Sequence, residues 1–236
     1  MCLVSHKHKF IYIKTFKTAS SSLYRLFSAY CCPPLESGDL DMAWDLHEPR
    51  TADEPLVSDY GVIGTRNKVR QIENWGAHIP LVAVKRELGE KIFNSYFKFT
   101  SVRHPAEQAV SAFYHNYHNY RNYRNLENNS DSELVSRKFH HYLKNQYDPD
   151  ENWNQYTINN VPACDDYIRF EDLSNETNRI LQILNLEPNL RIPQLRKGDP
   201  PKCQSKSLYK DANRKLYETM FEKELNFFNY TLSQYL

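Results

Sequence analysis

Two segments of this chain constrain its fold most, because each reads as a strand that runs into a polar turn and then a helix. Residues 9–13 are mostly apolar, and a turn with one lysine and several hydroxyls follows at 17–22. Residues 97–102 form a second strand-like stretch, which ends at Arg103 and is followed by Pro105, a residue typical of the first helical turn. Strands that alternate with helices predict an α/β fold with a central parallel sheet flanked by helices. Ligands bind beyond the carboxyl ends of such strands, so both turns are candidate binding sites.

Length and composition narrow the classes of protein to consider. A chain of 236 residues is long enough for one sizeable core, and we expect a single domain over 1–236. The 30 basic and 29 acidic residues nearly cancel, so any anion site must be local and nucleic-acid binding is not indicated. The five cysteines form no C-x-x-C pair, which weighs against a disulfide framework or a zinc site. No apolar run approaches the ~18 residues of a membrane span, and a signal-peptide core is lacking, so we expect a soluble cytoplasmic protein.

Local patterns predict the remaining elements. Proline and glycine end several of them, and Gly89 is expected to close the helix before it. Ser174 is the expected N-cap of the helix that follows the strand at 166–170. Residues 35–60 and 188–206 are expected to form loops. The other expected elements are helices at 20–29, 66–73, 80–88, from 105 onward and at 210–227, and a short strand at 60–63.

The 17–22 turn carries groups that suit an anion. Lys17 supplies a point charge, while hydroxyls and the first backbone N–H groups of a helix supply directional donors. The turn is not a P-loop, because the glycines of that motif are missing. An ordinary serine-rich N-cap beside a surface lysine is the alternative interpretation.

Arg103 is the candidate phosphate ligand of the second segment. A guanidinium presents parallel donors that match a phosphate, and Ser111 follows on the next element with a hydroxyl donor. The alternative interpretation is a salt bridge at the end of the strand.

These residues resemble the donor-binding motifs of sulfotransferases. Lys17-Thr18-Ala19-Ser20 with Ser22 resembles the 5′-phosphosulfate loop, closest to the form in carbohydrate enzymes such as the heparan sulfate and uronyl 2-O-sulfotransferases. Arg103 with Pro105 and Ser111 is similar to their 3′-phosphate motif. The resemblance extends to residues 169–173 and to a pattern across 209–230. Phe16 departs from it, because the family usually has proline there.

The resemblance implies a P-loop-NTPase-like fold and 3′-phosphoadenosine 5′-phosphosulfate (PAPS) as co-substrate, with adenosine 3′,5′-bisphosphate as product. It implies that the 17–22 turn holds the 5′-phosphosulfate and that Arg103 and Ser111 hold the 3′-phosphate. A basic segment before the last helix is similar to one that closes over the 3′-phosphate in cytosolic sulfotransferases; a solvated basic loop is its alternative. The implied donor-binding residues are Lys17, Thr18, Ala19, Ser20, Ser21, Ser22, Arg103, Ser111, Arg196, Lys197 and Gly198.

His78 is the expected catalytic base. Transfer to a hydroxyl needs a group that accepts a proton near neutral pH, which histidine does. The segment around His78 resembles the family's Gly-His segment, and Lys17 would stabilise the leaving bridging oxygen. His104 is the main competitor, although the family usually has Asp or Asn there and does not use that residue as the base. No metal is expected.

A triplet repeat at 115–124 offers weak candidates for substrate contacts. Tyr117, Arg121 and Arg124 could stack on sugar rings and bind acidic groups of a glycan, although a polar helix face is the alternative.

The sequence therefore predicts a sulfotransferase that moves a sulfuryl group from PAPS to a hydroxyl, most readily of a carbohydrate. We expect a bacterial or viral soluble enzyme, or a trimmed catalytic domain. Two rivals remain: a binding module for anionic glycan or nucleic acid without catalysis, and a non-sulfating nucleotide-dependent kinase.

Overall fold

The computed structural model describes residues 2–33, 55–65, 75–76, 78–119, 132–187, 192, 208–209 and 212–235. The chain divides into two compact units. The sheet unit comprises Met1–Val102 with Asn152–Leu195, and the helical unit comprises Arg103–Glu151 with Arg196–Leu236. The expectation of a single domain stays a prediction.

The sheet unit contains a six-stranded mixed sheet in the order β3-β4-β1-β2-β5-β8. Strands β2, β5 and β8 pair in parallel, which confirms the predicted α/β fold. Strands β1, β3 and β4 are antiparallel to their neighbours, which the sequence did not indicate. The link of residues 6–9 between β1 and β2 is too short for a crossover, so it can join only antiparallel strands. The bounds are β1 Cys2–Ser5, β2 Phe10–Ile13, β3 Leu56–Ser58, β4 Gly61–Ile63, β5 Phe97–Val102 and β8 Asp166–Arg169.

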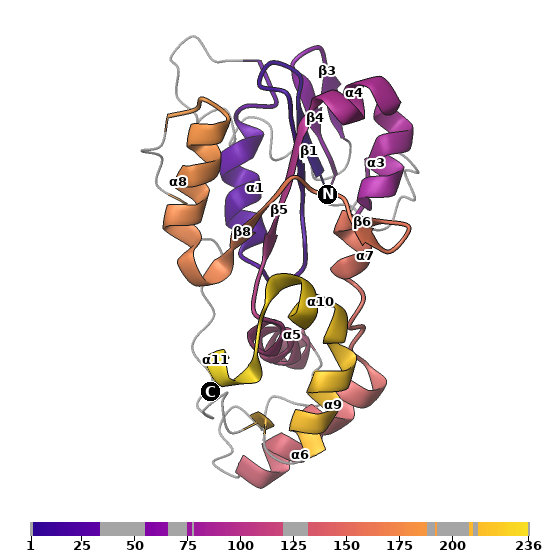
Figure 1. The fold of residues 1–236 in the computed structure, drawn as a ribbon, viewed down its shortest axis with the longest axis vertical. Helices are drawn as coiled ribbons and strands as arrows, with labels where there is room; N and C mark the ends of the chain where they lie inside the picture. Colours follow the sequence, from indigo (N-terminus) through magenta and orange to yellow (C-terminus); the bar gives the residue numbers. More distant parts are fainter. Residues whose placement is uncertain are drawn as a thin grey trace. The chain divides into compact units, whose positions relative to one another are not determined.

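Helices cover both faces of this sheet (Figure 1). Helices α1 (Ser20–Ser28) and α8 (Leu173–Ile183) pack on one face, where Phe10 and Tyr12 join one apolar cluster. Helix α3 (Leu81–Leu88) and helix α4 (Glu90–Ser95) pack on the other. Because side chains alternate along a strand, β2 contributes Ile11 and Ile13 to this second cluster. The sheet is therefore the middle of three layers. Apolar packing on both faces fixes the positions of its parallel strands.

A short helix and a hairpin follow the return of the chain to the sheet unit. Helix α7 (Trp153–Tyr156) leads into β6 (Thr157–Ile158) and β7 (Val161–Pro162). Asn159 and Asn160 both have positive φ, at 53° and 62°, as a tight two-residue hairpin turn requires.

The helical unit is built around buried aromatic rings. Its helices are α5 (Pro105–Asn119), α6 (Ser132–Asn145), α9 (Ala212–Met220), α10 (Glu222–Phe228) and α11 (Leu232–Tyr235). Phe113, Phe139, Tyr209, Tyr217 and Phe221 form a chain of ring contacts with centroids 5.1–5.3 Å apart. The tyrosine-rich composition is thus partly explained by this core.

Three predicted boundaries were wrong. Ser174 is not the N-cap of α8, because the 3-10 turn Phe170–Asp172 runs directly into a helix that starts at Leu173. The final helix is divided at Phe221, whose buried ring packs on Tyr217 while its backbone leaves helical geometry. Strand β3 lies within a stretch expected as loop. The predicted helix at 66–73 lies outside the described residues.

Candidate functional site

The 17–22 loop leaves β2 and enters α1 through two left-handed residues. Lys17 has φ 62° and Ala19 has φ 59°, a region that non-glycine residues occupy at a cost in free energy. Left-handed residues in such loops aim backbone N–H groups into one concavity, which suits an anion. Within the described part of the chain no side chain caps α1 at its N-cap Ala19, and the first turn of α1 is three serines. The loop thus adopts, without glycine, left-handed backbone angles of the kind that glycine usually supplies.

A buried network of hydroxyl groups holds the loop in shape. The Thr18 hydroxyl lies 2.8 Å from the hydroxyls of both Thr15 and Ser101. Thr15 donates to the Ser101 carbonyl oxygen at 2.5 Å, and Ser20 donates to the Thr15 carbonyl oxygen. All four residues are at most 5% exposed. Thr18 and Ser20 therefore shape the loop through their side chains, whereas sequence reasoning assigned them only to the donor.

Asn152 holds the residue before the loop. Its Oδ1 accepts the Phe16 N–H at 2.6 Å, and its Nδ2 donates to the Phe16 carbonyl oxygen at 3.0 Å. The ammonium of Lys17 lies 5.9 Å from the centre of the Phe16 ring. Sequence reasoning missed Asn152 and Ser101: 136 residues separate Asn152 from Phe16, and no local pattern joins them.

Arg103, in the helical unit, follows β5 directly along the chain. Its guanidinium lies 2.9 Å from Glu107 Oε1, with the arginine side chain 14% exposed and the glutamate 34%. The salt bridge of the alternative interpretation is therefore present. Ser111 lies four residues beyond Glu107 on α5, at the spacing of one helical face. A phosphate at Arg103 would compete with this carboxylate.

His104 is engaged through both ring nitrogens. Nε2 lies 2.9 Å from the Thr231 carbonyl oxygen, and Nδ1 accepts the Ala106 N–H at 3.3 Å. Because a carbonyl oxygen only accepts, Nε2 is the donor in the contact with Thr231. The residue is 4% exposed and caps the start of α5. These contacts give His104 a structural role at the start of α5.

His78 lies in the sheet unit, shortly before α3. Its φ is 59°, and the Ile79 N–H bonds the Gly76 carbonyl oxygen at 3.4 Å. The side chain is partly exposed, as a proton acceptor for an outside substrate must be. Its role as the base stays a prediction.

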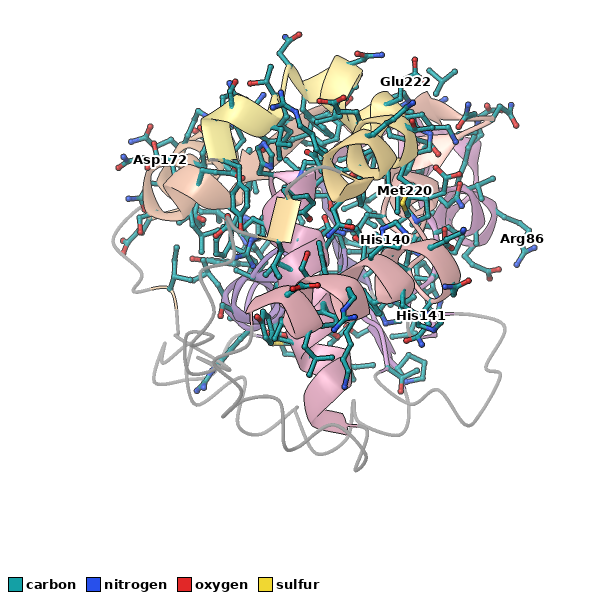
Figure 2. The ribbon with its side chains drawn as sticks, turned by 90° about the horizontal axis from the view of Figure 1, so that it is seen from below. Arg86, His140, His141, Asp172, Met220 and Glu222 are labelled. Atoms are coloured by element: carbon teal, nitrogen blue, oxygen red, sulfur yellow. The ribbon has the colours of Figure 1, made fainter. Side chains whose placement is uncertain are left out.

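Two other histidines, labelled on α6 in Figure 2, have different surroundings. His140 Nδ1 lies 2.7 Å from Asn213 Oδ1, which links α6 to α9, and His141 is exposed beside Asn145. Among the described residues, no group of three or more His, Cys, Asp or Glu is placed to hold a metal ion. Cys2, Cys31, Cys32 and Cys164 are free thiols.

Several predicted residues cannot be placed. Arg196, Lys197, Gly198, Arg121 and Arg124 lie outside the described residues, as does the side chain of Tyr117. Their assigned roles stay predictions.

A parallel β-α unit that opens into an anion-binding loop is typical of enzymes that bind nucleotide phosphates. A model of the sulfotransferase family matches residues 1–231. The chain belongs to the sulfotransferase family and is a PAPS-dependent enzyme, with PAPS as co-substrate. No curated protein and no solved structure matches it. In the described part of the chain no helix has the length and apolar character to cross a membrane.

Family membership decides between the classes that the sequence left open. A sulfuryl transferase is neither a kinase nor a binding module without catalysis. The narrower resemblance to carbohydrate enzymes is not tested by the family match.

Proposed function

We propose that the 17–22 loop binds the 5′-phosphosulfate of PAPS and that Arg103 and Ser111 bind its 3′-phosphate. The observation that carries this assignment is the loop itself: left-handed residues, Lys17 and Ala19, lead into the first turn of α1, and Lys17 supplies the local positive charge. The structure shows this arrangement at the carboxyl end of β2, where a ligand of an α/β sheet is expected.

Chemistry follows from two groups of the sheet unit. The acceptor hydroxyl attacks sulfur as His78 takes its proton, and the bond from sulfur to the bridging oxygen of the donor breaks. Lys17 stabilises the negative charge that develops on that oxygen, so the products are a sulfate ester and adenosine 3′,5′-bisphosphate. Positioning and electrostatic stabilisation supply most of the rate enhancement, as in phosphoryl transfer. No metal takes part in this proposal.

The acceptor we propose is a carbohydrate hydroxyl. Support comes from Lys17-Thr18-Ala19-Ser20, which resembles the loop of the carbohydrate enzymes. A screen with labelled PAPS should therefore show transfer to uronic-acid-containing oligosaccharides and not to simple phenols. Transfer to phenols alone would overturn the carbohydrate assignment and leave donor binding untouched.

The first experiment is thermal unfolding with and without adenosine 3′,5′-bisphosphate. A ligand that binds only the native state adds ~2.7 kcal/mol at 100 times its Kd, which is easily detected. We expect a clear shift for the wild type and for His78→Ala, because His78 acts on the acceptor. Lys17→Ala and Arg103→Ala should each reduce the shift. No shift for the wild type at millimolar ligand would contradict the proposed donor site.

His78→Ala separates catalysis from binding. The expected result is a fall in kcat of about 10²- to 10⁴-fold with an unchanged Kd for the bisphosphate. His141→Ala is the matched control, because that histidine is exposed on α6. Equal activity in the two variants would remove His78 from the mechanism.

A further inference from the structure

The 17–22 loop holds a shape that its own sequence disfavours. Lys17 and Ala19 carry side chains, so their left-handed φ values of 62° and 59° cost free energy that glycine would not cost. Such conformations persist only where the surrounding structure fixes them. The contacts on both sides of the loop are therefore part of the site.

The part of the loop that follows Lys17 is held by contacts with β5 and with the start of α1. Thr18 is bound by hydroxyls of Thr15 and Ser101, and the Ser22 N–H bonds the Ala19 carbonyl oxygen at 2.9 Å as α1 begins. The upstream side, at Phe16, has a partner from a distant part of the chain, which is Asn152.

Asn152 binds Phe16 as a neighbouring strand would. One planar amide accepts the Phe16 N–H at 2.6 Å and donates to the Phe16 carbonyl oxygen at 3.0 Å, so both peptide planes beside Phe16 are oriented. The side-chain amide of asparagine carries a donor and an acceptor in one plane, so one group satisfies both. Asn152 is 4% exposed, so water is poorly placed to replace it.

Asn152 is itself anchored. Its carbonyl oxygen accepts the Gln155 N–H at 2.9 Å in the first turn of α7. The next residue, Trp153, is buried, and its indole N–H donates to Asn160 Oδ1 at 2.6 Å in the β6–β7 hairpin. The clamp on Phe16 is thus built on a fixed element.

We propose that Asn152 is a positioning residue for sulfuryl transfer: through the main chain of Phe16 it holds the 17–22 loop in the shape that binds the 5′-phosphosulfate. Asn152 acts on the loop and need not touch the donor. The inference rests on the proposed donor site.

Two ligands that differ by one phosphate test it. Adenosine 3′,5′-bisphosphate carries the 5′-phosphate that the loop binds, and adenosine 3′-monophosphate lacks it. We expect Asn152→Ala to raise the Kd of the bisphosphate roughly tenfold, as the loss of two buried hydrogen bonds would. The Kd of the monophosphate should stay within about twofold, since a local change in the loop leaves the other phosphate untouched.

The outcomes separate the inference from the proposed function. If Asn152→Ala weakens both ligands equally, Asn152 is merely structural and the inference is overturned. If Lys17→Ala weakens the bisphosphate while Asn152→Ala does not, the donor site stands and the inference fails alone. If the wild type binds neither ligand, both fail. Asn145→Ala, an exposed asparagine of α6, is the matched control and should change neither Kd.

A second variant keeps the test decisive if Asn152→Ala does not fold. In Asn152→Asp the ionised carboxylate accepts the Phe16 N–H but cannot donate to the Phe16 carbonyl oxygen. Protonation of the new carboxyl restores a donor, so its affinity for the bisphosphate should recover toward the wild-type value as the pH is lowered. If the ratio of the Asn152→Asp Kd to the wild-type Kd for the bisphosphate stays constant across pH, the proposal is overturned.

Discussion

The two proposed phosphate-binding regions of this enzyme are held by different forces. The 17–22 loop, in the sheet unit, is shaped by uncharged groups that are almost fully buried: Thr15, Thr18, Ser101 and Asn152. Arg103, in the helical unit, forms an ion pair with Glu107, whose side chain is 34% exposed. The loop is held in shape by buried hydrogen bonds, whereas the Arg103 guanidinium is already paired with a carboxylate.

This difference predicts how each region responds to a ligand and to salt. Buried neutral hydrogen bonds are little affected by ionic strength, so the loop should keep its shape without a donor. A partly exposed ion pair is screened and contributes little to stability, so a phosphate can replace Glu107 at small cost.

The largest expected effect is on the rate at the loop. Lys17→Ala should lower kcat by about 10²- to 10³-fold, because it removes the charge that we propose stabilises the leaving oxygen. Steady-state transfer assays with labelled PAPS measure this. Lys14→Ala is the matched control, since Lys14 precedes the 17–22 loop and its ammonium lies 5.7 Å from the centre of the Tyr24 ring on α1. Equal losses in both variants would indicate a general charge effect instead of a role for Lys17.

A smaller effect, on affinity, is expected at Arg103. Arg103→Ala should weaken adenosine 3′,5′-bisphosphate about ten- to a hundredfold, as the loss of charge-assisted hydrogen bonds would. Isothermal titration at two salt concentrations measures it, and the variant should also lose salt sensitivity. Arg214→Ala is the control, because Arg214 forms the same type of pair with Glu218 on α9 at 3.2 Å. Unchanged affinity in Arg103→Ala would mean that Arg103 does not bind the 3′-phosphate.

The neutral network of the loop should matter for stability as well as for binding. Thr18→Val removes the hydroxyl that bridges Thr15 and Ser101, and we expect the free energy of unfolding to fall by about 1–3 kcal/mol. Urea unfolding at low and high salt should give the same loss. Thr219→Val is the control: that hydroxyl is exposed on α9 and bonds only its own helix. A loss that disappears in salt would mean that charges, not hydroxyls, hold the loop.

Sequence reasoning succeeded where the information is local. The strand at 97–102 was predicted with the bounds of β5, and Gly89 does end α3, with φ 75°. These features follow from side-chain pattern and from the backbone freedom of glycine at that single position. Lys17 and Arg103 were found as candidates because a family motif keeps them beside strand ends.

Sequence reasoning failed where the partner is distant along the chain. Strand β1 looks like a lead-in to β2, and only its pairing with β4 shows it as an inner strand. Asn152 lies in a polar turn typical of any loop, so nothing local marks it as the partner of Phe16. The ion pair of Arg103 was offered only as the alternative interpretation, a salt bridge at the end of the strand, and Glu107 was not named as the partner.

Glu107 gives the smallest expected effect and the sharpest test of the comparison. A partly exposed pair at this spacing contributes a few tenths of a kcal/mol, so Glu107→Gln should bind adenosine 3′,5′-bisphosphate only about twofold more tightly. The gain arises because the ligand no longer displaces a carboxylate, and it should shrink as salt is added. Glu218→Gln, from the pair on α9, should change nothing.

The sign of that change decides what the ion pair is for. Tighter binding means that Glu107 competes with the phosphate for the Arg103 guanidinium, which the carboxylate pairs with until the ligand displaces it. Weaker binding would mean that Glu107 orients the Arg103 guanidinium for the ligand, and the second region would then be preorganised like the first. In that case the two regions would differ only in the chemistry of their support, neutral in the loop and ionic at Arg103, and Arg103→Lys should be as damaging as Arg103→Ala because a lysine cannot bind both anions in parallel.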